Sequence, residues 1–319
     1  MSERQFDATS TTDQVLDGID LSGKRVVITG CSSGLGAEAA RALASRGAAV
    51  TLTGRDVEKT RAVADTIRES TGNDRLDVRA LELDVPDSVR AFAKGWLADH
   101  DRLDLLLNNA GVMACPLRRT AEGWEQQFAT NHVGHFLLTA LLAPALKAAA
   151  PSRVVNVSSG GHRLSDVDYE DTHFEERAYD KFVAYGQSKT ANILHAVELD
   201  RRLGPAGVHA YAIHPGVIMT ELARHMSAED IRAITGSRSE DQPPMTLQSV
   251  EAGAATGVFA GTAPELEGRG ALYLEDCQVS GTTPPEGALG CSAYALDPEN
   301  ARRLWAHTEG LLGERFDLA

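Results

Sequence analysis

Hydrophobic residues follow two alternating patterns along the chain. Short apolar runs rich in β-branched residues, such as RVVIT at 25–29, are typical of buried strands. Longer segments with apolar residues three and four positions apart, such as 35–46, indicate helices that bury one face. The predicted strands cover 25–29, 48–53, 78–83, 103–108, 153–157, 208–213 and 271–274. The predicted helices cover 35–46, 57–69, 87–99, 124–147, 185–203 and 298–312.

The alternation of strands and helices predicts a parallel sheet covered on both faces. We therefore expect an α/β fold: a single Rossmann-type, doubly wound parallel sheet with helices on both faces. The length of 319 residues allows one or two domains. We predict one dinucleotide-binding catalytic domain over 22–319, preceded by a polar leader over 1–21.

Two stretches, 160–184 and 220–248, interrupt this rhythm. Each follows the end of a predicted strand, and open α/β sheets bind ligands beyond the carboxyl ends of their strands. We expect these insertions to wall a substrate site, with ordinary surface loops as the alternative. A Gly/Pro-rich stretch and the helix at 298–312 form a C-terminal helical tail.

Charge and composition narrow the range of partners. The formal net charge of -14 opposes binding to nucleic acid or anionic lipid. The first twenty residues lack the apolar stretch of a signal peptide, and no apolar span is long enough for a bilayer. The four cysteines, Cys31, Cys115, Cys277 and Cys291, show no C-x-x-C spacing. A cytoplasmic protein without a membrane span is the expectation.

The segment TGCSSGLG at 29–36 lies where a strand passes into a helix. Glycine backbone and the N–H groups of a helix N-terminus can meet a pyrophosphate there. The glycine spacing is G-x-x-x-G-x-G rather than G-x-G-x-x-G, and a plain structural turn is the alternative. The candidate cofactor-binding residues of this turn are Gly30, Ser32, Ser33, Gly34, Leu35 and Gly36.

The end of the second strand bears on which dinucleotide would bind. An acidic residue there holds the ribose hydroxyls of NAD, whereas an arginine accommodates the 2′-phosphate of NADP. The strand ends in LTGR at 52–55, with no acid before Asp56. Arg55 offers a planar fork for phosphate oxygens, so NADP(H) is favoured over NAD(H). A solvated surface cation is the alternative for Arg55.

Tyr185 and Lys189 stand four residues apart in a predicted helix and therefore share a face. An unperturbed tyrosine has a pKa of about 10, so acid/base work near neutrality needs a lower value, and a nearby ammonium would lower it. Among the six tyrosines only Tyr185 has a Lys or Arg four residues later. His132 and His135 are i,i+3 but lack a third ligand, so no metal site is predicted.

Five motifs in order give the chain its resemblance to the short-chain dehydrogenases/reductases. They are TGxxxGxG at 29–36, NNAG at 108–111, Ser159, YxxxK at 185–189 and PG at 215–216. The segment NVSS at 156–159, the 26-residue interval from Ser159 to Tyr185 and NHxGHF at 131–136 resemble the retinol-dehydrogenase and WW-domain-oxidoreductase branch.

The resemblance implies a catalytic tetrad. Tyr185 would be the general acid/base, Ser159 would hydrogen-bond the substrate oxygen, Lys189 would hold the nicotinamide ribose and lower the pKa of Tyr185, and Asn131 would anchor a water in a proton relay. Ser158 is the rival of Ser159. The further cofactor contacts that it implies are Asp84, Val85, Asn109, Ala110, Gly111, Pro215, Gly216, Val217 and Thr220. Helix capping by Asp84 and a simple turn at 215–216 are the alternatives.

The function expected from this resemblance is NADP(H)-dependent interconversion of a carbonyl and an alcohol on a lipophilic small molecule. A non-catalytic NADP(H)-binding sensor or scaffold is one alternative, and an enone (C=C) reductase on the same fold is another. The resemblance also implies a homodimer or homotetramer built through the helices that begin near Trp124 and Tyr185.

Overall fold

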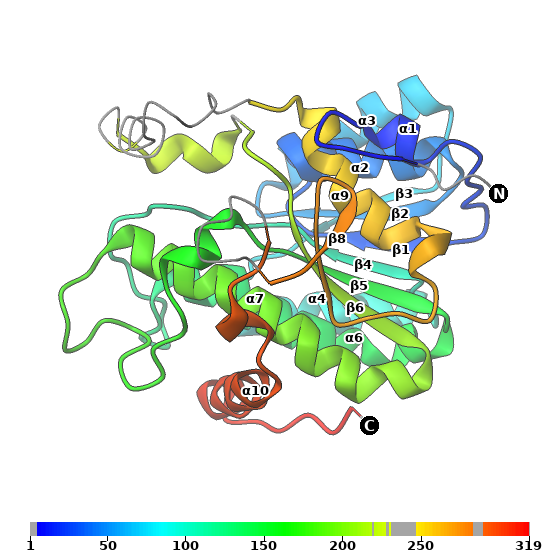
Figure 1. Cartoon of the computed structure of the whole chain (residues 1–319). Coiled ribbons are helices and arrows are strands. Elements are labelled where there is room, and N and C mark those ends of the chain that lie inside the picture. Colours follow the sequence, from blue (N-terminus) through cyan, green and yellow to red (C-terminus); the bar gives the residue numbers. More distant parts are fainter. Residues whose placement is uncertain (1–4, 219, 228–229, 231–246, 283–289, 319) are drawn as a thin grey trace, which may run out of the picture.

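A single sheet organises the computed structural model, which describes residues 5–218, 220–227, 230, 247–282 and 290–318. The sheet has eight strands in the order β3-β2-β1-β4-β5-β6-β7-β8 (Figure 1). Only β8 runs antiparallel to its neighbour. This arrangement confirms the predicted doubly wound α/β fold. The strands are β1 Arg25–Ile28, β2 Ala49–Gly54, β3 Leu76–Ala80, β4 Leu105–Asn108, β5 Ser152–Val157, β6 Val208–His214, β7 Leu272–Glu275 and β8 Gln278–Ser280.

The order of the strands creates a crevice. β1 pairs with β2 on one side and with β4 on the other, so the chain reverses its direction of winding at β1. The loops that follow β1 and β4 therefore diverge to opposite faces of the sheet and leave space between them. The candidate site lies at this position.

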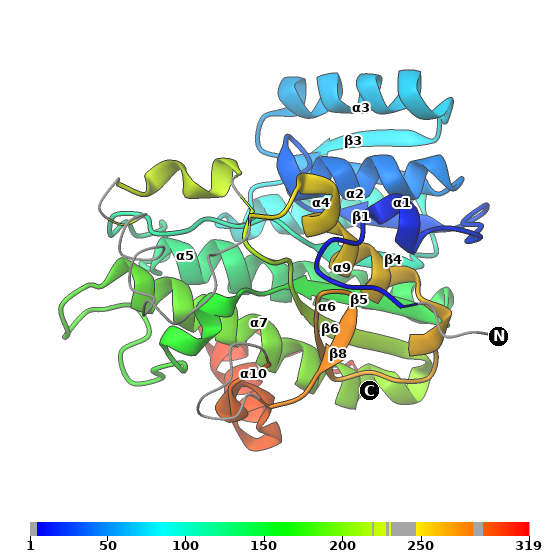
Figure 2. The same cartoon turned by 45° about the horizontal axis from the view of Figure 1, so that its top comes forward.

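Two cores form because alternate residues of each strand point to opposite faces. Val26 and Ile28 of β1 pack into one core with α2 Gly34–Ser45, α3 Val57–Thr71 and α9 Val250–Thr262. Val27 packs into the other core (Figures 1 and 2). The helices of that second face are α4 Pro86–Asp99, α6 Gly134–Ala148, α7 Lys181–Leu203 and α10 Pro298–Leu312.

Three helical segments differ from the pattern-based prediction. The predicted helix at 124–147 is divided into α5 Gln126–Phe128, a π-helical turn at Ala129–Val133 and α6. α7 begins at Lys181, four residues before the predicted start, because Asp180 caps it by accepting hydrogen bonds from the backbone N–H groups of Phe182 and Val183. α9 was not predicted, since nine of its 13 residues are buried and its apolar residues form no stripe.

The predicted polar leader packs on the domain. Val15 and Leu16 are fully buried in the same core as α2 and α9. The short helix α1 Thr12–Val15 has a capping box between Thr11 and Gln14, and Arg41 of α2 forms an ion pair with Asp13 at 2.9 Å. The packing therefore shows no division at residue 21.

The remaining described elements are short 3-10 helices at the ends of strands and helices. They are η2 Gly160–Leu164, η3 Gly204–Ala206, η4 Glu221–His225, η5 Pro264–Leu266 and η6 Ala293–Leu296. Much of the predicted insertion at 220–248 lies outside the described residues. In the part of the chain that the structure describes, no helix combines the length and apolarity that a bilayer crossing requires.

Candidate active site

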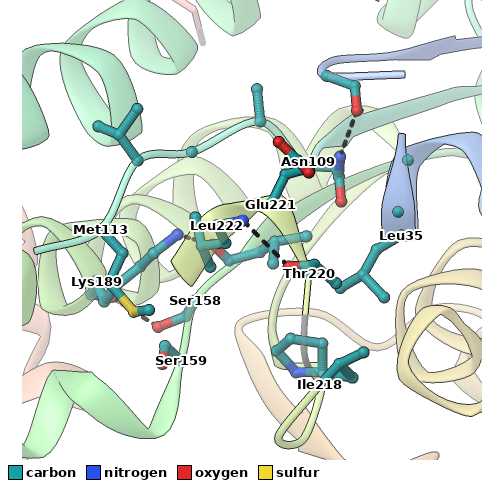
Figure 3. A pocket seen from close by; sticks show the side chains of 18 of the residues that line it. Leu35, Asn109, Met113, Ser158, Ser159, Lys189, Ile218, Thr220, Glu221 and Leu222 are labelled. Carbon is teal, nitrogen blue, oxygen red and sulfur yellow. Dashed lines mark hydrogen bonds between the residues drawn. The ribbon is translucent and has the colours of Figure 1, made fainter. Parts of the chain in front are cut away.

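A cavity of about 1190 Å³ opens at the carboxyl ends of β1, β2, β4, β5 and β6. In Figure 3, Ser159 and Lys189 lie on one side of it, and Leu35 and Ile218 lie on the other. The cavity receives residues from every predicted motif. All the predicted site residues line it except Val85 and Asn131.

The glycine turn after β1 has the backbone that a bound dinucleotide needs. Gly30 and Gly34 have φ angles of +75° and +61°, which L side chains rarely adopt. A Cβ on Gly36 would lie 2.3 Å from the carbonyl oxygen of Gly30, so only glycine allows this close approach. Ser33 is the N-cap of α2, yet its side chain makes no capping hydrogen bond. The N–H groups of the first turn of α2 are therefore available to a phosphate.

The end of β2 carries no free acid toward the cavity. Asp56 is the N-cap of α3, and its carboxylate accepts a hydrogen bond from the Lys59 backbone N–H at 2.9 Å. Arg55 is exposed and lines the cavity.

Two neighbouring residues, predicted to meet the adenine, are placed differently from each other. Asp84 lines the cavity and accepts a hydrogen bond from the Gln126 side chain at 3.4 Å. Val85 is the N-cap of α4, 41% exposed and outside the cavity lining. Asp84 therefore does not cap α4, because Val85 occupies the N-cap position.

The loop after β4 is tied to the glycine turn by hydrogen bonds. The backbone N–H groups of Asn109 and Ala110 both donate to Thr29 Oγ1 at 2.9 Å, and Asn109 Nδ2 donates to the Thr29 carbonyl at 2.8 Å. A Cβ on Gly111 would lie 3.2 Å from Asn131 Oδ1 and 3.5 Å from Lys189 Nζ. The loop therefore passes close to both residues, and a side chain at position 111 would have to displace Asn131 slightly.

The segment after β6 forms another wall of the cavity. Pro215, Gly216, Val217 and Thr220 all line it. Gly216 has a φ of +91°, and a Cβ at that position would lie 1.9 Å from the Gln248 side chain. The backbone conformation of Gly216 and its close approach to Gln248 therefore both require glycine in this wall of the cavity.

Ser159, Tyr185 and Lys189 come together between β5 and α7. Ser159 Oγ accepts a hydrogen bond from the Gly161 backbone N–H at 3.0 Å, and it lies close enough to the Tyr185 hydroxyl to lower the pKa of that phenol. Lys189 Nζ donates to the Val157 carbonyl at 2.9 Å and lies 5.6 Å from the centroid of the Tyr185 ring. The predicted helix spacing thus produces the expected cluster of a phenol, a hydroxyl and an amine.

Burial dominates the electrostatics of this cluster. It raises the pKa of Tyr185 to about 12, against a smaller lowering by the hydrogen bond with Ser159. It lowers the pKa of Lys189 to about 7. The sequence-based expectation that the ammonium lowers the pKa of Tyr185 is therefore not met here, because desolvation outweighs any attraction between the two groups.

Asn131 supports the cavity from behind its wall. Its side chain is fully buried in the π-helical turn, accepts a hydrogen bond from the Val112 N–H at 2.8 Å, and donates to the Val112 carbonyl at 3.0 Å and to Ser188 Oγ at 2.9 Å. The backbone carbonyl oxygen of Asn131 accepts a hydrogen bond from His135 Nδ1 at 2.9 Å. The side chain thus clamps the loop after β4 to α7.

The two serines at the end of β5 have different partners. Ser158 is buried and its hydroxyl donates to the Lys189 carbonyl at 2.8 Å. Ser159 instead meets Tyr185. Ser159 is therefore the better placed of the two to reach a substrate oxygen.

Other residues of interest in the sequence have structural partners. His135 contacts Thr29 Oγ1 at 2.9 Å, and His132 contacts Thr308 Oγ1 at 2.8 Å. Cys31 is fully buried, and burial raises the pKa of its thiol to about 12. Among the described residues, no cluster of three or more His, Cys, Asp or Glu side chains could hold a metal ion.

Several lining residues carry no motif and escaped the sequence-based prediction. Ala8 and Thr9 come from the N-terminal segment, and Ser249 and Ala252 come from the start of α9. A weak signal existed for the N-terminal segment, since apolar residues interrupt its polar pattern at Phe6, Val15 and Leu16. Much of the remaining wall is apolar: Met113, Leu164, Phe182, Leu222, Met226 and Leu247.

A doubly wound sheet with a glycine turn, an uncapped helix N-terminus and a Tyr-Ser-Lys cluster at one cavity defines the class of dinucleotide-dependent oxidoreductases. The family model of the short chain dehydrogenases matches residues 24–231. The chain belongs to this family, in its retinol-dehydrogenase-like branch, and uses a nicotinamide cofactor.

Similar proteins support the same placement. Human retinol dehydrogenase 12 is 42% identical over 299 residues, which cover 94% of this chain and 89% of the relative. A probable oxidoreductase of Streptomyces antibioticus is 43% identical over 296 residues, covering 91% and 97%. Among solved structures, an uncharacterised protein from Mycobacterium paratuberculosis has a TM-score of 0.72 at 36% identity, covering 93% of this chain and 96% of that one. The Pseudomonas aeruginosa RhlG/NADP complex has a TM-score of 0.62 at 25% identity, covering 80% and 95%.

Proposed function

We propose that the protein interconverts a carbonyl and an alcohol on a lipophilic small molecule and prefers NADP(H). The observation that carries this proposal is the meeting of Tyr185, Ser159 and Lys189 at one cavity with an uncapped helix N-terminus. The glycine turn, Arg55 and the loop 109–111 would hold the dinucleotide, whose nicotinamide supplies or accepts the hydride.

The residues of the chain account for the rest of the chemistry. Negative charge develops on the carbonyl oxygen as hydride arrives, and Ser159 can donate a hydrogen bond to it. Tyr185 can then donate its hydroxyl proton to that oxygen, since burial keeps the phenol protonated at neutral pH. Lys189, held by the Val157 carbonyl, would position the nicotinamide ribose.

The preference for NADP(H) rests on the end of β2. Arg55 lines the cavity, and the carboxylate that follows it in the chain, Asp56, is occupied in capping α3. The structural neighbour RhlG is in complex with NADP, which supports the same preference by similarity.

The substrate class rests on the apolar part of the wall. Met113, Phe182, Leu222 and Met226 line the same cavity as the Tyr-Ser-Lys cluster. Relatives bear the name retinol dehydrogenase, so retinal is a suitable first probe beside simpler lipophilic aldehydes and ketones.

The deciding experiment follows the consumption of NADPH and NADH with this panel, in the native chain and in Tyr185→Phe. We expect NADPH to be consumed by the native chain alone and the product to be the alcohol. A variant as fast as the native chain would overturn the role of Tyr185. Retention of the carbonyl with loss of a C=C bond would instead identify an enone reductase, and NADPH binding without turnover of any probe would favour a sensor.

A further inference from the structure

His162 lies directly behind Ser159, in the 3-10 helix that follows β5. It is fully buried. Its Nδ1 is 2.6 Å from the Ser159 carbonyl oxygen, and its Nε2 is 3.1 Å from the Ser292 backbone nitrogen. The imidazole therefore bridges the serine of the Tyr-Ser-Lys cluster and a segment more than 120 residues further along the chain.

The two partners fix the tautomer of the ring. A backbone N–H can only donate, so Nε2 must accept from Ser292 and carries no proton. A carbonyl oxygen can only accept, so Nδ1 must carry the proton and donate it to Ser159. Burial lowers the pKa of His162 to about 4, which keeps this neutral form across the neutral pH range.

The backbone of His162 is held as firmly as its ring. Its carbonyl oxygen accepts hydrogen bonds from Tyr294 Oη at 2.6 Å and from Thr190 Oγ1 at 3.0 Å. Thr190 follows Lys189 on α7, and Tyr294 belongs to the C-terminal segment 290–294. The titratable groups around the ring are Tyr273 at 5.4 Å on β7, the neighbouring Arg163 and His214 on β6.

We propose that His162 is a positioning residue for the proposed reaction: its Nδ1–H holds the Ser159 carbonyl, and its Nε2 takes support from the Ser292 N–H. This inference rests on the proposed function. The hydroxyl of Ser159 has to reach Tyr185 and a substrate oxygen at once, and its direction depends on the peptide plane that His162 holds. The C-terminal segment 290–294 thereby becomes part of the support of the active site.

Two substitutions separate the hydrogen bonds of the ring. Asn carries its amide group at the same number of bonds from Cβ as Nδ1, so His162→Asn can keep the bond to Ser159. Gln reaches the position of Nε2, so His162→Gln can keep the bond to Ser292 and loses the side-chain bond to the Ser159 carbonyl, which then keeps only the bond from the backbone N–H of residue 162 at 3.1 Å. We expect kcat to fall about 100-fold in the Gln variant, as for a misplaced reacting group, and only a few-fold in the Asn variant. The affinity for NADPH should be unchanged in both.

The pH profile distinguishes positioning from a general loss of stability. Ser159 lowers the pKa of Tyr185. A misplaced Ser159 hydroxyl in His162→Gln would no longer do so, and the alcohol-oxidation rate should then rise only at a higher pH. His162→Asn should keep the native profile. Equal profiles and equal kcat in the two variants would overturn the proposal.

A pair of substitutions tests the remote end of the bridge. Ser292 has a φ of -62°, which proline adopts, so Ser292→Pro puts the ring Cδ in place of the N–H that faces His162 and removes the side-chain hydroxyl. Ser292→Ala keeps the N–H and is the matched control. We expect kcat to fall in the Pro variant and to stay at the native value in the Ala variant. The same kcat in both variants would show that the N–H of Ser292 gives His162 no support.

One readout requires no turnover and therefore separates this proposal from the proposed function. The Gly161 N–H is bonded to Ser159 Oγ, so its hydrogen exchange by NMR reports the direction of that hydroxyl. We expect faster exchange in His162→Gln and native protection in His162→Asn. If the native chain reduces no carbonyl, the proposed function fails. Unchanged exchange in His162→Gln overturns the positioning role of His162.

Discussion

Tyr185 and Lys189 share one buried environment, and burial acts on them in opposite directions. The charged form is disfavoured in each case, so the pKa of the phenol rises to about 12 and that of the amine falls to about 7. The proton therefore stays on Tyr185 at neutral pH. This state suits the donation of a proton to a carbonyl oxygen.

A pH dependence follows from this protonation state. Carbonyl reduction needs protonated Tyr185, so its rate should change little between about pH 8 and about pH 10, where Lys189 has already lost its proton and Tyr185 still holds its own. Alcohol oxidation needs the ionised phenolate, so its rate should rise with pH over the same range. Steady-state rates in both directions at saturating cofactor would check this. A reduction rate that falls steeply over this range would contradict it.

The preference for NADPH can be tested at Arg55. Replacing Arg55 with Gln removes a fork-shaped donor for a 2′-phosphate, and hydrogen bonds to charged groups contribute about 1.5–3 kcal/mol. We expect the Kd for NADPH to rise about 10-fold to 100-fold, with little change for NADH, as measured by nicotinamide fluorescence.

A matched control for Arg55 lies on α3. Arg61 is half-exposed and pairs with Glu58 on the same helix, so Arg61→Gln removes the same charge outside the cavity lining. Equal losses of NADPH affinity in the two variants would mean that only the net charge matters.

Short spacings predicted most of the individual site residues. The glycine turn, Ser159 and the Tyr185–Lys189 pair depend on residues close in sequence, where geometry follows from one turn or one helix. The role of Asn131 as a buried clamp depends on Val112 and Ser188, which are brought to it by tertiary packing. The pKa of Tyr185 depends on burial, which spacing does not reveal.

At the scale of elements, the sequence predicts α7 well and does not predict α9. α7 combines the Tyr-Lys spacing with a capped start, and only its first turn was missed. α9 was missed because burial on nearly all sides leaves no amphipathic pattern. Its residue Gly253 allows close approach, since a Cβ there would lie 2.5 Å from the Ile218 side chain.

α6 depends on one glycine where it passes Leu83, in the loop between β3 and α4. A Cβ on Gly134 would lie 2.1 Å from the carbonyl oxygen of Leu83, a backbone atom that cannot turn away. We expect Gly134→Ala to lower the free energy of unfolding by about 1–3 kcal/mol, as overpacking does. Urea denaturation would measure this loss.

A second helical glycine provides the control for Gly134. Gly310 in α10 has open space around the position of a Cβ, so Gly310→Ala should raise stability by up to about 1 kcal/mol through helix propensity. If Gly134→Ala and Gly310→Ala changed the free energy of unfolding by the same amount, the close contact with Leu83 would not explain the effect of Gly134→Ala.

At the scale of the whole molecule, α10 covers the helices expected to join two copies. Trp305 packs edge-to-face against Phe136 of α6 with ring centroids 4.6 Å apart, and the Arg202 guanidinium of α7 lies 4.2 Å from the centroid of the Trp305 ring. His132 is hydrogen-bonded to Thr308. The predicted homo-oligomer could form through these helices only if α10 left this position. Otherwise its interface would have to lie on a different surface.

We therefore expect the protein to be a monomer in solution. Light scattering of the full chain over a range of concentrations would measure its mass. A dimer that persists in Arg202→Ala and Trp305→Ala would show an interface elsewhere. A dimer in the native chain that dissociates in these variants would show that copies do meet through α7 and α10.

Buried histidines should make the fold sensitive to acid. Burial lowers the pKa of His135, His162, His173 and His214 to about 4 and that of His195 to about 3. An unfolded histidine binds a proton below about pH 6.5, so the unfolded state holds more protons than the folded state between these values. The free energy of unfolding is therefore highest above about pH 6.5 and falls as the pH is lowered toward 4, by up to about 1.4 kcal/mol per pH unit for each such histidine.

Urea denaturation at a series of pH values would measure this slope, and one histidine can be isolated from the rest. His195 is a buried residue of α7, where its Nδ1 contacts Asn156 Nδ2 at 3.3 Å and its ring packs against Phe136 and Trp305. His195→Gln keeps a polar group near Asn156 and removes one group that titrates. Between about pH 6.5 and about pH 4, the free energy of unfolding of this variant should fall less steeply with pH than that of the native chain. The difference in slope should equal the contribution of one histidine. Parallel slopes would mean that acid destabilises the fold through other groups.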